Sequence, residues 1–176
     1  MLDAGFDVSA PASPAVLAVP GGPAVPAPPA VSMPAGRRLT LPHNAPRAEG
    51  LGNQCTAYAL DRMYEATGLW LRSRGHAGQW GQTAREAGWT VGTEPAPRSI
   101  VVMPYDEGHR YVLFTGGTLS RAAVHPAYGH VGWVERLDST GNWALVSDQN
   151  WNGDGARGVR WVWLKGATLQ FIYSDR

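Results

Sequence analysis

The order of hydrophobic patterns along the chain is the feature that most restricts its fold. Residues 55–67 carry apolar side chains at helical spacing, and a second helix is expected over 77–87. Gly68 and Gly88 are placed to end these helices, since glycine readily adopts the left-handed conformation of a helix C-cap. After Pro95 the pattern changes to short apolar or alternating runs, which are typical of strands. Helices followed by strands predict the α+β class.

The strand-like runs predict an antiparallel sheet of about five to six strands. A loop at 138–142, rich in turn-forming residues, joins two of the runs as a hairpin. The helix that begins at Cys55 is expected to pack on this sheet. The runs lie at residues 100–103, 111–114, 130–137, 143–148, 159–164 and 169–173.

The N-terminal part of the chain has a different composition. Residues 9–33 consist almost wholly of Ala, Pro, Val, Gly and Ser. Because proline fixes φ and lacks a backbone N–H, neither a helix nor a strand ladder is expected there. We therefore divide the chain into a Pro/Ala-rich extended arm or linker, residues 1–46, and a folded domain, residues 47–176. The arm is either a flexible tether or a strap laid on a partner.

Charge and cysteine content exclude several kinds of partner. Fifteen basic and fourteen acidic residues leave a net charge of +1, which provides no field to gather nucleic acid. No run reaches the roughly 20 apolar residues that cross a bilayer, so no membrane insertion is predicted. Asp3 and Asp7 lie where a signal peptide is basic, so no signal peptide is predicted. Because Cys55 is the single cysteine, no thiolate metal cluster is possible, and neither a metal nor a cofactor is expected.

A thiol nucleophile and a histidine base are the first candidate site residues. Cys55 lies in the first turn of its helix, where free N–H groups and the helix dipole stabilise a thiolate. His130 opens a strong strand run, and Gly129 and Gly132 leave room beside it. A lone cysteine is also commonly an inert buried residue, so position alone does not assign its role.

The hairpin indicates which carboxylate orients the imidazole. The five-residue loop is expected to pair Leu137 roughly with Trp143. In that register His130, Asp148 and Asn150 share one face of the sheet, because side chains two residues apart point to the same side. Asp148 is therefore the preferred orienting group, and a slip of one residue would undo this choice.

Three separated segments resemble the motifs of one family. Residues 52–58 (GNQCTAY) look like its nucleophile motif, with Ala57 where an aromatic residue is common. Residues 128–135 (YGHVGWVE) look like its histidine strand. Residues 147–152 (SDQNWN) are similar to its Glu-x-Asn segment, with Asp148 in place of Glu. The family is the CHAP domain, a papain-like group of cysteine, histidine-dependent amidohydrolases and peptidases that cut bacterial peptidoglycan. The resemblance spans about residues 50–173, with 104–127 as a longer insertion.

The resemblance implies acyl transfer with Cys55 as nucleophile and His130 as base. Asp148 would orient the imidazole, and Asn150 would be an auxiliary polar group. The backbone N–H of Cys55 and the side chain of Gln54 would hold the oxyanion, although Gln54 serves equally well as a polar residue that satisfies a loop.

Tryptophan is abundant, with eight residues in the chain. Three of them flank the matched motifs and are candidates for substrate binding along a glycan-peptide groove: Trp80, Trp133 and Trp151. The alternative is that they are core residues, since large aromatics dominate burial in small domains.

The leading hypothesis is a peptidoglycan hydrolase, either an endopeptidase or an N-acetylmuramoyl-L-alanine amidase. The bond stays open among the stem peptide, the cross-bridge and the glycan-peptide amide. A Pro-rich lead without a signal peptide favours a phage endolysin or a virion tail-associated lysin, located in the virion or in the host cytoplasm before release to the cell wall. The arm would then bind phage tail proteins. The alternatives are a structural assembly module with vestigial catalysis and an ordinary protein-cutting cysteine peptidase.

Overall fold

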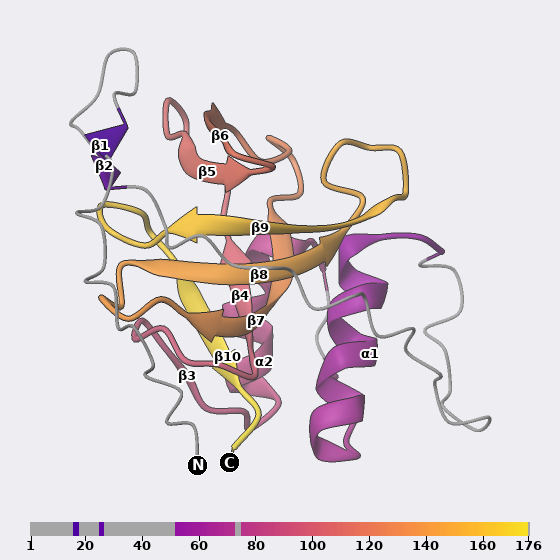
Figure 1. The fold of residues 1–176 in the computed structure, drawn as a ribbon. Coiled ribbons are helices and arrows are strands. Elements are labelled where there is room, and N and C mark those ends of the chain that lie inside the picture. The colour runs from indigo at the N-terminus through magenta and orange to yellow at the C-terminus, as the bar shows by residue number, and fades with distance from the viewer. Residues whose placement is uncertain (1–15, 18–24, 27–51, 73–74, 176) are drawn as a thin grey trace, which may run out of the picture.

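A computed structural model of the chain describes residues 16–17, 25–26, 52–72 and 75–175. It contains a helical part followed by a curved antiparallel sheet (Figure 1), which confirms the predicted α+β class. Among the described residues no helix has the length and apolar character needed to cross a membrane. The helical elements are α1 (Cys55–Thr67), the 3₁₀ turn η1 (Ala77–Gln79) and α2 (Trp80–Glu86). The strands of the main sheet are β3 (Val91–Gly92), β4 (Ser99–Met103), β5 (Tyr111–Thr115), β6 (Thr118–Ala122), β7 (His130–Leu137), β8 (Trp143–Gln149), β9 (Arg157–Trp163) and β10 (Gln170–Tyr173).

The helix ends follow from local sequence. Helix α1 has the predicted bounds, and Gly68 ends it in the left-handed conformation with φ 71°, its N–H donating to the carbonyl of Tyr64. The second predicted helix begins as the 3₁₀ turn η1 and continues as α2. Gly88, with φ 85°, lies two residues beyond the end of α2.

The main sheet has eight strands in the order β3-β10-β4-β7-β8-β9-β5-β6, so the predicted number of five to six is too low. All six predicted runs are strands, and the two missed strands are β3 and β6. Strand β3 has only two residues, which is too short to show an alternating pattern. Strand β6 is largely exposed and polar, and it pairs with β5 across a turn at Gly116 and Gly117.

The prediction that residues 9–33 form no ladder is wrong at four positions. Strands β1 (Val16–Leu17) and β2 (Val25–Pro26) pair antiparallel as a separate two-stranded sheet. Strands this short have no central position, so proline is tolerated at an edge. The remainder of that prediction, and most of the arm at 1–46, lies outside the described residues.

The main sheet lies between two of the three buried hydrophobic clusters of the described residues. On one face α1, η1 and α2 cover alternate residues of β4 and β7, with Met63 and Trp80 buried against Ile100 and Val131. On the other face side chains of β5 and β10 belong to one cluster although these strands are distant in the sheet order. The sheet must therefore curl around this second core. The Tyr111 hydroxyl at the start of β5 donates to the carbonyl of Pro104, directly after β4, at 2.7 Å.

A β-bulge adjusts the pairing of β7 with β8. Near the turn Leu137 pairs with Ala144, one residue away from the expected partner Trp143. The register then shifts at Glu135, between the two flanking ladder pairs. Because the bulge absorbs one residue, the register on the other side of it is the one that the sequence predicted.

Candidate active site

Cys55 is the first residue of α1, and its sulfur lies where the helix tip meets the start of β7. The thiol is hydrogen-bonded to the His130 ring and to the backbone N–H groups of Thr56 and Val131. The cap residue Gln54 has an extended backbone and makes no side-chain cap hydrogen bond. The N–H groups of the first turn are therefore not occupied by a capping side chain, and their dipoles favour negative charge on the sulfur.

His130 and Asp148 face one another across the β7–β8 ladder. Trp133 pairs with Ser147, which puts His130 and Asp148 on the same face, as the parity argument predicted. The ring Nε2 lies 2.9 Å from Asp148 Oδ2, and the two residues are 5% and 0% exposed. Gly132 lets the two strands approach each other here, because a Cβ there would lie 2.5 Å from Val146 Cγ1 and 3.1 Å from the Ser147 carbonyl oxygen.

The thiol and the imidazole shift each other's pKa in opposite directions. Burial alone would raise the pKa of Cys55, but the hydrogen bond with His130 and the charge of its ring lower it below the usual thiol value. Burial alone would lower the pKa of His130, but its hydrogen bonds with Asp148 and Cys55 raise that pKa to about 9. The arrangement thus favours a thiolate beside an imidazolium.

The carboxylate of Asp148 has a second partner that the sequence reading missed. Arg160 Nη2 donates to Asp148 Oδ1 at 2.8 Å, and the guanidinium carbon lies 4.6 Å from the centre of the Trp151 ring. Trp151 in turn meets His130 edge-on, with ring centroids 4.7 Å apart. Arg160 lies on β9, which pairs with β8 across a second hairpin. The loop of this hairpin is long, so the sequence does not predict which residues of β8 and β9 pair.

Asn150 lies near the site but not against the imidazole ring. Its Nδ2 donates to Gln54 Oε1 at 2.7 Å, and its Oδ1 accepts from the Gly155 N–H at 2.7 Å. It adopts a left-handed backbone with φ 63°, a conformation that asparagine tolerates. Asn150 therefore links the β8–β9 loop to the tip of α1, where the two lie side by side in Figure 1.

The three tryptophans predicted to bind substrate occupy different environments. Trp80 and Trp133 are each 2% exposed in the core under α1, so neither side chain can line a groove in this structure. Their place is explained by apolar burial, which was the alternative reading. Trp151 is half-buried and contacts His130, which leaves it as the one member of the set beside the candidate site.

A second polar network, also missed, connects α1 to the sheet. The Tyr58 hydroxyl donates to Ser147 Oγ at 2.9 Å, and Ser147 donates to Glu135 Oε1 at 2.6 Å. Arg62 pairs with the other oxygen of Glu135 at 2.9 Å. Tyr58 and Arg62, one helical turn apart on α1, therefore anchor the helix that carries Cys55.

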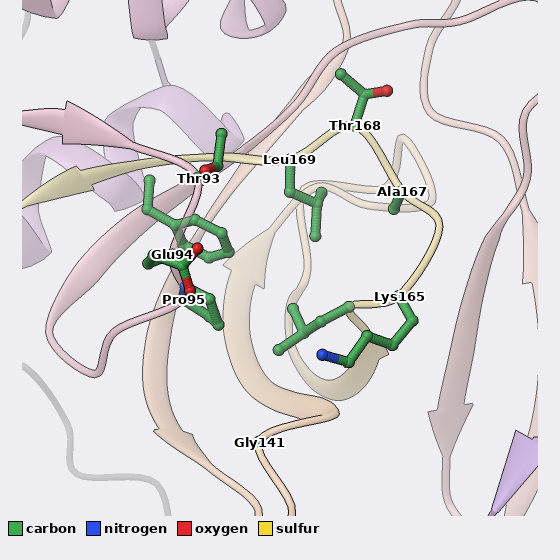
Figure 2. Close-up of a pocket in the computed structure, with 10 residues that line it drawn as sticks. Thr93, Glu94, Pro95, Gly141, Lys165, Ala167, Thr168 and Leu169 are labelled. Atoms are coloured by element: carbon green, nitrogen blue, oxygen red, sulfur yellow. The ribbon is translucent and has the colours of Figure 1, made fainter.

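A cavity of about 260 Å³ lies at the other end of β7. Figure 2 shows Lys165 reaching into it, opposite the loop that contains Glu94. Its walls are residues 93–95, Gly141 and side chains of the segment 164–171. None of the predicted site residues lines it, because Gly141 belongs to the turn after β7 whereas His130 begins that strand.

The fold and site define a class of protein. A cysteine at a helix tip, a histidine at the start of a strand and a carboxylate on the next strand are the elements of a papain-like arrangement. The model of the CHAP domain family matches residues 45–150, and the chain belongs to this family.

Individual relatives agree with this assignment. The chain is 32% identical over 129 residues to Staphylococcal secretory antigen SsaA of Staphylococcus epidermidis, covering 71% of this chain and 40% of that protein. It is 29% identical over 117 residues to Staphylococcal secretory antigen ssaA2 of Staphylococcus aureus, covering 66% and 34%. A crystal structure of an N-acetylmuramoyl-L-alanine amidase from Staphylococcus aureus superimposes with a TM-score of 0.54 at 25% identity, covering 68% of this chain and 30% of that one. The chain thus spans well under half the length of each of these proteins.

Proposed function

We propose that this domain hydrolyses an amide bond of bacterial peptidoglycan by acyl transfer through Cys55. The observation that carries the proposal is the chain of contacts from the Cys55 thiol through the His130 ring to Asp148 Oδ2. Family membership and the likeness to an amidase support the substrate class.

Each proton in the proposed reaction has a carrier. The Cys55 thiolate attacks the amide carbonyl carbon, and the imidazolium of His130 gives its proton to the leaving amine nitrogen, so that a thioester remains. Water then attacks the thioester carbon and loses a proton to the His130 ring. The acid leaves and the thiolate is restored. Because Asp148 holds Nε2, the ring nitrogen that faces the sulfur is Nδ1.

The developing oxyanion would be held by the Cys55 backbone N–H and the Gln54 side chain. Gln54 Oε1 accepts from Asn150, which turns the amide so that its NH₂ group is left to donate. Asn150 thus serves the site indirectly, by orienting Gln54. Exchange of Asn150 for Ala would then slow hydrolysis through the oxyanion donor and not through the imidazole.

The favoured bond is the amide between glycan and peptide, because the superimposed structure is described as an N-acetylmuramoyl-L-alanine amidase. The test is digestion of purified cell walls by wild type and Cys55→Ala, with mass spectrometry of the released muropeptides. Loss of the stem peptide from muramic acid is expected with wild type alone. A cut within the stem peptide or cross-bridge would support a hydrolase but show that a different bond is cleaved. Equal release by both proteins would refute the proposal that the domain is a hydrolase.

The place of action belongs to the same proposal. We infer that the domain works at the cell wall, delivered from a virion or from the cytoplasm of a phage-infected host, with the arm at 1–46 as the segment that contacts tail proteins. An assembly module with vestigial catalysis is the competing function, and wall digestion separates the two. The contacts that link Cys55, His130 and Asp148 support the enzyme over the assembly module.

A further inference from the structure

Arg160 and Trp151 close a ring of contacts around the proposed catalytic pair. Asp148 bridges His130 and Arg160 with its two oxygens, each at 2.9 Å or less. Trp151 bridges the same two residues on the other side, edge-on to the imidazole and beneath the guanidinium. His130 and Arg160 are therefore each in contact with both Asp148 and Trp151.

The carboxylate at the centre of this ring needs a countercharge. Asp148 is 0% exposed, and burying an ionised carboxylate is costly unless it is paired and hydrogen-bonded. Arg160, with a side chain 11% exposed, supplies the pairing charge. Its planar guanidinium also stacks on the Trp151 ring, which a lysine cannot do equally well.

Strand β9 is shaped to admit the guanidinium. Gly158 pairs with Asp148 across β8 and β9, and Arg160 lies two residues further along the same strand. A Cβ at Gly158 would come within 2.7 Å of Arg160 Nη2 and 3.5 Å of Asp148 Oδ1. The missing side chain at Gly158 is the reason that Arg160 reaches the carboxylate.

We propose that Arg160 and Trp151 are positioning residues, a guanidinium-indole clamp that fixes Asp148 so that the His130 ring stays directed at the Cys55 sulfur. The role of this clamp in catalysis rests on the proposed function, but its contacts are those of the protein without substrate. It also explains how aspartate serves where the family commonly has the longer glutamate: the shorter side chain is held in place from β9.

The test measures the ionisation of Cys55 without any substrate. Because the chain has one cysteine, the rate of alkylation by iodoacetamide reports the thiolate at this position alone. The titratable groups that face His130 are Cys55 from α1 and Asp148 from β8, and Arg160 faces Asp148 from β9. The rate is measured from pH 4 to 10 on the full chain.

Arg160→Gln is expected to shift the rise of the alkylation curve upward by about one pH unit, a loss of about tenfold in rate at pH values below the wild-type rise. The reason is that burial raises the pKa of the thiol once the imidazolium no longer pairs with it. Arg160→Lys should recover part of the loss, since the charge stays but the stack is weakened.

Two further variants keep the test decisive if Arg160→Gln folds poorly. Gly158→Ala removes no charged group but displaces the guanidinium of Arg160 from Asp148, so it should shift the curve in the same direction. Arg136→Gln is the matched control, because Arg136 also stacks over a tryptophan, Trp161, at 5.5 Å on β7. It should follow the wild-type curve.

Wild-type curves for both Arg160→Gln and Gly158→Ala would overturn the clamp, and so would an equal shift in Arg136→Gln, which would indicate a general loss of packing. If the variants show the expected shifts but the wild-type protein leaves cell walls intact, the proposed function is refuted and the clamp is supported.

Discussion

At the residue scale, the candidate site depends on charged groups that stabilise one another. Cys55 has the lowered pKa and His130 the raised pKa because each is hydrogen-bonded to the other, and Asp148 holds the far side of the ring. Sequence reasoning found these three, since a helix start, a strand start and strand parity are all visible in one chain. It missed Arg160 because that contact depends on the register of a third strand. It left Trp80 and Trp133 open between substrate binding and the core, because composition does not distinguish a core aromatic residue from an exposed one.

The ion pair predicts a bell-shaped dependence of wall hydrolysis on pH. Activity should rise as the pH passes the lowered pKa of Cys55, since the thiolate forms there, and the rise should lie below the usual thiol pKa of 9.0. It should fall as the pH passes about 9, where His130 loses the proton that it gives to the leaving amine. The check is the initial rate of turbidity loss from pH 4 to 11. An upper limb near pH 6.5, the ordinary histidine value, would contradict the pairing.

At the element scale, glycines decide how closely the strands and the 3₁₀ turn approach each other. Gly129 precedes His130 with φ 66°, and a Cβ there would lie 2.8 Å from the Met103 carbonyl and 2.9 Å from the backbone of Gly78. The helices and long strands were predictable because their patterns are strong. Strands β3 and β6 were not, because one is two residues long and the other has a largely exposed, polar surface.

Gly129→Ala is expected to lower the free energy of unfolding by about 3 kcal/mol, the sum of left-handed strain and a collision with backbone that cannot move aside. Gly141→Ala is the matched control, because Gly141 has φ 68° but open space around its missing Cβ. It should cost about 1 kcal/mol. Urea unfolding followed by tryptophan fluorescence measures both. Equal losses would mean that the close approach at Gly129 contributes nothing.

At the scale of the whole molecule, the candidate site and the three buried hydrophobic clusters lie within residues 54–173. Every candidate site residue falls between Gln54 and Arg160, and β1 and β2 pair with each other in a sheet separate from the main one. Composition predicts a proline-rich arm followed by a domain, and this division stays a prediction because most of the arm lies outside the described residues. The sequence could not predict the short β1–β2 ladder, because two-residue strands leave no periodic signal.

Removal of residues 1–46 is therefore expected to leave the folded part that carries the candidate site intact. The melting temperature should stay within about 2 °C of the full chain, and hydrolysis of isolated walls within about twofold. Calorimetry and the turbidity assay measure the two quantities. Loss of wall hydrolysis with an unchanged melting temperature would make the arm part of the site instead of a connection to a partner.

The bulge at Glu135 has a practical consequence for redesign of the protein. It separates the pairing at the hairpin tip from the pairing at the catalytic end, so a change in the length of the 138–142 turn can be accommodated before it reaches His130. The tip lies roughly 20 Å from the catalytic end along β7, given the rise of an eight-residue strand. We expect a peptide inserted into this turn to leave the contacts among Cys55, His130 and Asp148 at the opposite end of the strand unchanged.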